Sequence, residues 1–127
     1  MQAYKVPHRS GYVNIDVAKR LTRAYGGQAH RVTAIAQQEK LSHRLVAWHD
    51  IIEAEVVYAA RYEMCRSAED FLARRCRLAF TDVRAARAAL PRVLELLGKE
   101  LGWSGWRGRA ARERQAAEAC LATFEAA

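Results

Sequence analysis

The sequence contains no uninterrupted apolar run of about 18 residues, the length that a membrane-spanning helix requires. Its N-terminus also has no apolar segment of the kind that forms the core of a secretory signal peptide. We therefore expect neither a membrane-spanning nor a secreted protein. The opening residues read as the start of a fragment, and we expect the chain to be a piece of a longer protein.

Cysteine is scarce, with only three residues, Cys65, Cys76 and Cys120, placed far apart. No two of them form a C-x-x-C pair, so the pattern indicates neither a disulfide framework nor a zinc site. Buried thiols in a reducing cytoplasm are the interpretation that this spacing favours.

Motifs that carry catalysis are also missing. Gly26-Gly27 lacks the spacing of a dinucleotide-binding G-x-G-x-x-G turn, and no strand pattern precedes it. His43, His49 and Asp50 resemble catalytic residues only superficially, because no nucleophile or metal ligand is placed beside them. The residues therefore predict a non-catalytic module with no cofactor or metal site of its own.

Positive charge is abundant. The net charge of +7 raises the alternative of a basic helical nucleic-acid-binding or adaptor domain. However, the charge is mostly arginine, is spread over most of the predicted helices and alternates with glutamate. A solvated or docking surface without nucleic acid is the interpretation that we favour.

Hydrophobic periodicity predicts an all-α fold, a compact single domain of about five to seven helices. At 127 residues the chain has the length of one domain. Residues 1–11 lack periodicity and are expected to form a linker or tail, so that the domain covers 12–127. Outside the centre, the expected helices cover about 14–25, 28–38, 82–101 and 105–123. Pro91 is expected to cause a break or a sharp kink near Leu90, with a new helix starting at Pro91. Residues 39–50 are expected to form an ordered loop that Trp48 anchors to the core.

A central helical hairpin is predicted over 53–80. Ile52, Val56 and Ala59 share one helical face, and Ser67 is a suitable N-cap for a second helix. This second helix ends in a basic run of Arg74, Arg75 and Arg77. We expect at least one of these arginines to bind a carboxylate or a helix-terminal carbonyl, and the candidate carboxylates are Glu55, Glu63 and Asp70.

The motifs of this stretch resemble those of the C-terminal domain of the FAD-dependent glycerol-3-phosphate dehydrogenases. They are E-A-E-V-V-Y-A-A-R-Y-E at 53–63 and D-F-L-A-R-R-C-R-L-A-F at 70–80. Tyr25-Gly26-Gly27 with Val32 to Ala36, and Ala89-Leu90-Pro91-Arg92-Val93 with Leu101-Gly102-Trp103, extend the resemblance over about 12–103.

The resemblance implies a C-terminal helical cap that is inactive alone. The full-length enzyme would oxidise sn-glycerol 3-phosphate to dihydroxyacetone phosphate, with FAD in an N-terminal domain that this chain lacks, and would pass electrons to quinone. The implied partners are that N-terminal FAD and substrate domain and, as an open alternative, a second copy. The implied location is the cytoplasm, with peripheral contact at the inner face of the membrane in the full-length enzyme. The candidate structural or domain-docking residues are Glu55, Tyr58, Arg61, Glu63, Asp70, Arg74, Arg75 and Arg77.

Overall fold

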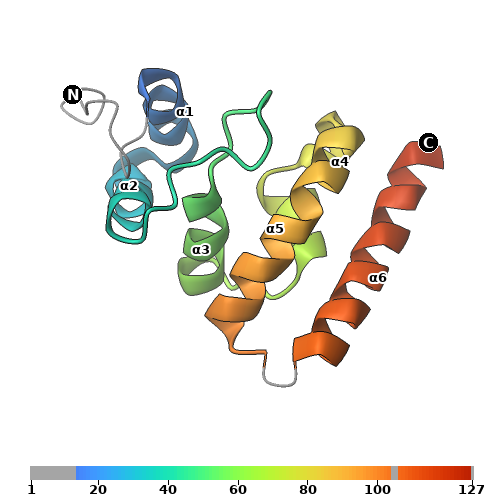
Figure 1. The fold of residues 1–127 in the computed structure, drawn as a ribbon. Coiled ribbons are helices and arrows are strands. Elements are labelled where there is room, and N and C mark those ends of the chain that lie inside the picture. The colour runs from blue at the N-terminus through green and yellow to red at the C-terminus, as the bar shows by residue number, and fades with distance from the viewer. Residues whose placement is uncertain (1–13, 104–105, 127) are drawn as a thin grey trace. The chain divides into compact units, whose positions relative to one another are not determined.

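The computed structural model describes residues 14–103 and 106–126, and for residues 106 and 107 it describes the backbone only. Six α-helices follow one another in these residues, together with a 3-10 turn and a π-helical segment (Figure 1). They are α1 (Ile15–Tyr25), η2 (Gly26–Gln28), α2 (Ala29–Gln38), α3 (Glu53–Tyr62), η3 (Asp70–Arg75), α4 (Leu78–Thr81), α5 (Val83–Leu101) and α6 (Trp106–Ala126). The predicted all-α fold is confirmed, and the only β-type pairing among the described residues is a bridge between Arg44 and Ile52.

The chain divides into two compact units, Met1–Tyr58 and Ala59–Ala127, which we call the first and the second unit. The division falls within α3. The predicted linker, residues 1–11, lies outside the described residues. None of the described helices combines the length and the apolarity that a membrane span needs.

In the first unit, α1 and α2 form a packed pair. The Asn14 side chain caps α1 by accepting a hydrogen bond of 2.9 Å from the backbone N–H of Val17. Gly26 follows α1 with φ +54°, a conformation that favours glycine. The buried face of the pair consists of Val17, Ala18, Leu21, Ala29, Val32, Ile35 and Ala36.

The loop between α2 and α3 is ordered, as predicted, but Trp48 does not anchor it. Trp48 is 58% exposed because it lies at the tip of a turn, which the N–H of His49 closes onto the carbonyl of Val46. The buried side chains of the loop are instead Leu41, Val46, Ile51 and Ile52, of which Val46 and Ile51 lie on either side of the turn. A tight turn directs its tip away from the interior, so the largest apolar side chain here was the wrong one to choose.

The second unit begins with the last turn of α3 and continues through the segment 68–75, so both arms of the predicted hairpin are present. Ser67 caps this segment, because its Oγ accepts a hydrogen bond of 3.1 Å from the N–H of Asp70. The helix then widens into η3, in which Phe71 and Leu72 are buried. Arg77, with φ +62°, separates it from α4.

The long helix α5 is continuous through Pro91, so a break with a new helix starting at Pro91 is excluded. The other predicted form, a sharp kink near Leu90, stays a prediction. A proline at this position removes one backbone hydrogen bond and costs about 3 kcal/mol in a helix interior. Pro91 itself is exposed, while Ala86, Leu90, Val93 and Leu97 bury a continuous stripe on the other side. Burial of that stripe offsets the proline, and water can reach the carbonyl that the proline leaves without its helical donor.

Helix α6 packs against α5 and, near its end, against α4 (Figure 1). Ala117 and Leu121 are its buried residues, and the ring of Phe124 meets Phe80 edge to face at 4.4 Å between centroids. Gly102 ends α5 with φ +61°, a left-handed conformation that favours glycine. The second unit is therefore built around α5, with its neighbours arranged along the apolar stripe.

Candidate functional site

The most tightly held polar group in the described residues is the carboxylate of Glu55, which is only 2% exposed. It accepts hydrogen bonds from the guanidinium of Arg20, from the Tyr25 hydroxyl at 2.9 Å and from the backbone N–H of Ile52 at 2.8 Å. All four residues belong to the first unit. The network therefore joins α1 to the start of α3 through one buried charge.

Local sequence places Glu55 in this position. Glu55 lies three residues after Ile52 and four before Ala59, so it projects from the same face of the helix as these buried residues. Burial raises the pKa of Glu55 above its ordinary value of 4.5, while the charge of Arg20 and the hydrogen bonds from Ile52 and Tyr25 oppose that rise. A carboxylate on an apolar face requires such donors, because leaving it without them would be costly.

Tyr58 completes the network as its aromatic neighbour. Its ring meets the ring of Tyr25 in a T-shaped contact, with centroids 5.2 Å apart and planes at 77°. This contact holds Tyr25 beside the carboxylate. Sequence reasoning selected Glu55 and Tyr58 but missed Arg20 and Tyr25 as their partners. A glutamate on an apolar face indicates that a cation lies opposite it. The sequence contains many arginines, so it does not indicate which one is the partner.

In the second unit, Arg61 forms an ion pair with Glu100 near the end of α5. The Nη2 atom of Arg61 lies 3.2 Å from one carboxylate oxygen, and its Nε donates to the other. This two-point geometry fixes the last turn of α3 to α5, and a lysine could not reproduce it.

The basic run makes three different contacts. Arg74 pairs with Asp70 at 2.7 Å on the same helix, and Arg75 donates to the backbone carbonyl of Glu63 at 2.6 Å. The guanidinium of Arg77 lies over the ring of Phe80, 4.9 Å from its centroid. Arg75 thus uses a helix-terminal carbonyl, one of the two kinds of partner expected, whereas Glu55 is bound by Arg20.

The cysteines are all thiols, and Cys65 is buried while Cys76 and Cys120 are half-buried. Burial raises the pKa of Cys65 to about 11, and its thiol donates to the carbonyl of Ser67 at 3.5 Å. A thiol that stays protonated at neutral pH is a poor nucleophile. Within the described residues, no three His, Cys, Asp or Glu side chains gather in a way that could hold a metal ion.

The Gly26-Gly27 turn does not fit the phosphates of a flavin dinucleotide. A phosphate-binding turn follows a strand and presents the N-terminus of a helix. Here the α-helix α1 leads into the glycines, and they form the 3-10 turn η2. The glycines therefore connect two helices of the first unit.

Comparison with known proteins gives the chain a family. Residues 2–108 match the family described as the C-terminal domain of alpha-glycerophosphate oxidase. The mitochondrial glycerol-3-phosphate dehydrogenase of Arabidopsis thaliana is 49% identical over 115 residues, covering 91% of this chain and 18% of that protein. The corresponding mouse and human proteins are 43% and 40% identical, covering 70% and 72% of this chain and 13% of each protein. No solved structure matches the chain.

These comparisons correct one expectation and confirm another. The cytoplasmic location is contradicted, since the relatives are named mitochondrial. The resemblance of the motifs does not fix a compartment, and reduced thiols indicate only a reducing environment. The resemblance seen in the motifs is confirmed, and nothing supports the nucleic-acid-binding or adaptor alternative. The chain spans less than a fifth of the length of these relatives, and it belongs to the family of the C-terminal domain of alpha-glycerophosphate oxidase.

Proposed function

We propose that this chain is the non-catalytic C-terminal cap domain of an FAD-dependent glycerol-3-phosphate dehydrogenase. The observation that carries the proposal is the family match over residues 2–108, together with relatives named glycerol-3-phosphate dehydrogenases in which the matching part is only 13–18% of the protein. The rest of such an enzyme has ample length for the chemistry.

The full-length enzyme would oxidise sn-glycerol 3-phosphate to dihydroxyacetone phosphate and pass the electrons to quinone. FAD, bound outside this chain, would supply the hydride acceptor. The geometry of the Gly26-Gly27 turn supports that division, since a helix leads into it where a phosphate-binding turn would have a strand. The mitochondrion, which the names of the relatives give as their location, is the compartment that we propose for this protein.

The cap would act by holding a fixed surface against the N-terminal FAD and substrate domain of the same enzyme. Two features support rigidity within each unit. The carboxylate of Glu55 ties α1 to α3 in the first unit, and Arg61 ties α3 to Glu100 in the second. Subunit contact through this domain, and peripheral contact of the full-length enzyme with a membrane, belong to the same proposal.

A chimera tests the proposed function. In the Arabidopsis thaliana enzyme, the segment that matches this chain is replaced by this chain, and a second version ends before the segment. Oxidation of glycerol 3-phosphate is followed through reduction of a quinone analogue, after flavin absorbance has shown equal loading. We expect the chimera to recover most of the activity that the truncated version loses. A flavin-loaded chimera as inactive as the truncated enzyme would contradict the proposal.

The isolated chain provides a complementary measurement. We expect it to be colourless after purification and to leave glycerol 3-phosphate unchanged. Stoichiometric flavin absorbance would show instead that the chain itself binds the cofactor.

A further inference from the structure

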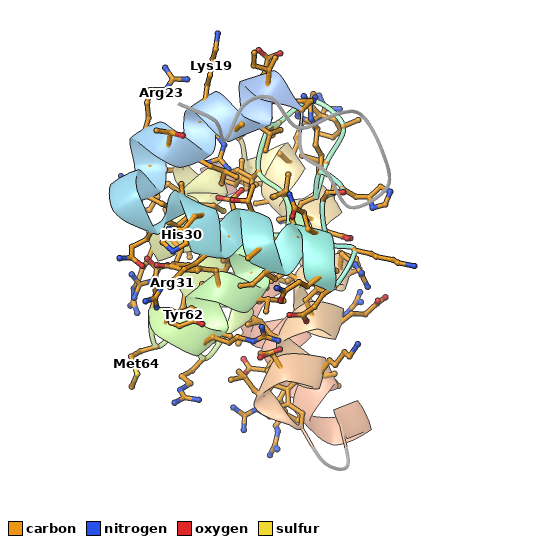
Figure 2. The ribbon with its side chains drawn as sticks, turned by 90° about the vertical axis from the view of Figure 1, so that its left-hand side faces the viewer. Lys19, Arg23, His30, Arg31, Tyr62 and Met64 are labelled. Atoms are coloured by element: carbon orange, nitrogen blue, oxygen red, sulfur yellow. The ribbon has the colours of Figure 1, made fainter. Side chains whose placement is uncertain are left out.

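Two large apolar side chains are exposed at the C-terminal end of α3. Tyr62, the last residue of the helix, is 52% exposed, and Met64 is 72% exposed. Figure 2 labels both and shows them at the surface beside the end of that helix. By contrast, the neighbouring residues Ala60 and Cys65 are buried. The turn therefore separates its side chains into a buried set and an exposed apolar pair.

Met64 occupies a backbone position that favours glycine. Its φ is +58°, and the N–H groups of Glu63 and Cys65 both donate to the carbonyl of Ala59. A left-handed residue just after a helix is usually glycine, because glycine has no Cβ. A methionine here costs stability and exposes apolar surface. Both costs are understandable if the side chain contacts something outside this domain.

The turn is held firmly. Arg75 donates to the carbonyl of Glu63 at 2.6 Å, and the thiol of Cys65 donates to the carbonyl of Ser67 at 3.5 Å. Because the backbone is fixed on both sides of Met64, a partner does not have to order this turn when it binds the apolar pair. Pre-organisation of this kind lowers the entropic cost of association.

The surroundings of the pair have the composition of a protein interface. Arg61, held in place by Glu100, precedes Tyr62, and the exposed Arg66 follows Met64 by two residues. Aromatic residues, methionine and arginine are enriched in protein–protein contacts relative to the rest of a protein surface. A pair of apolar side chains bordered by arginines is suited to binding the surface of another folded protein.

We propose that Tyr62 and Met64 dock on the part of the full-length enzyme that precedes this domain in the same polypeptide. The inference rests on the proposed function. The matching family is a C-terminal domain, and its relatives carry more than four-fifths of their length outside the matching part. That preceding part is therefore present at one copy per domain and is tethered to it, which gives it a high effective concentration at this surface. A second copy of this chain is the competing occupant.

Photo-crosslinking in the full-length enzyme tests the occupant. Benzoylphenylalanine replaces Met64, and in a control it replaces Arg112, an exposed residue of α6. Mass spectrometry then locates the cross-linked peptides. We expect position 64 to react with peptides that precede this domain, within one polypeptide and at least five times as much as position 112. Reaction mainly with a second copy, or no more than at the control position, would overturn the proposal.

Substitutions separate docking from folding. Met64→Gly suits the backbone conformation, so we expect the melting temperature of the domain to stay the same or rise. In the full-length enzyme, proteolysis at the junction before this domain should become at least five times faster with Met64→Gly or Tyr62→Ser. Ile15→Ser, which removes another exposed apolar side chain, should not change it. An unchanged rate in both variants at the end of α3 would overturn the proposal.

The two hypotheses fail in different experiments. Turnover of glycerol 3-phosphate by the unmodified full-length enzyme decides the proposed function. If the enzyme uses another substrate while position 64 cross-links to the preceding part, the docking surface stands and the function falls. If it oxidises glycerol 3-phosphate without that cross-link, the function stands and this surface is not the docking site.

Discussion

The two units of this chain use charged residues in opposite ways. In the first, a glutamate is buried at the centre of a network that links α1 to α3. In the second, the interior is the apolar stripe of α5, and pairs such as Arg74–Asp70 and Arg92–Glu95 lie at the surface. The side chain of Arg74 is 80% exposed, against 3% for Glu55.

This contrast shows that the contribution of an ion pair to stability depends on how deeply the pair is buried. An exposed pair gains little because water already solvates both charges, and such pairs contribute about 0.2–1 kcal/mol. Removing one partner of a buried pair leaves a desolvated charge behind, which costs about 3–5 kcal/mol. The same residue types therefore predict unequal effects in the two units.

The largest effect is expected from Glu55→Ala. It removes the acceptor of the hydrogen bonds from the Tyr25 hydroxyl and the Ile52 N–H, and it leaves the half-buried guanidinium of Arg20 without this carboxylate. We expect the free energy of unfolding to fall by about 3–5 kcal/mol. Urea unfolding followed by circular dichroism measures it. Glu95→Ala, which breaks an exposed pair, is the control and should cost no more than about 0.5 kcal/mol. Equal losses would show that the buried network has no special weight.

Truncation of the apolar stripe gives the next effect. Leu97 is fully buried in α5, and Leu97→Ala should lower the free energy of unfolding by about 2–5 kcal/mol, since it leaves a cavity. Leu101→Ala, at a half-buried position of the same helix, should cost clearly less. Thermal melting of both variants tests this. A parent-like melting temperature for Leu97→Ala would mean that α5 does not organise the second unit.

A pH series examines the buried charge itself. The pKa of Glu55 is raised from 4.5 by burial, so the folded state holds the proton more tightly than the unfolded state. Between the two pKa values the folded state binds more protons, and its stability must therefore fall as pH rises from about 4.5. Glu55→Gln cannot titrate at this position. The unfolding free energy of the parent, minus that of Glu55→Gln, should decrease over this range. A difference that is constant, or that increases, would reverse the assigned direction.

The smallest effects should separate two neighbouring arginines. Arg75→Lys loses the guanidinium contact with the Glu63 carbonyl and should cost about 0.5–1.5 kcal/mol. Arg74→Lys keeps a charge beside Asp70 within one exposed helix turn and should change stability by less than about 0.5 kcal/mol. Melting temperatures of the two variants provide the comparison. If both melt like the parent, the contact of Arg75 is not structural, and only docking or solvation remains for the basic run.

Local signals in the sequence determined where several of the helical segments begin and where α5 ends. Asn14, Ser67 and Asp82 each accept a backbone hydrogen bond from a residue three positions later, and Gly102 provides the left-handed turn after α5. Each of these contacts involves residues at most four positions apart, so the identities of neighbours are enough to predict it. The buried stripe of α5 is local in the same sense, because the helical period places its residues on one face.

Tertiary structure alone decided the contacts between distant segments. Glu55 was a candidate from its own position, but its binding to Arg20, 35 residues earlier, depends on how α1 lies against the start of α3. The continuity of α5 through Pro91 likewise depends on the packing around the helix. In each case a local preference competes with the burial of many other side chains. The outcome depends on the total free energy of packing over the fold. No short stretch of sequence contains the residues that determine this total.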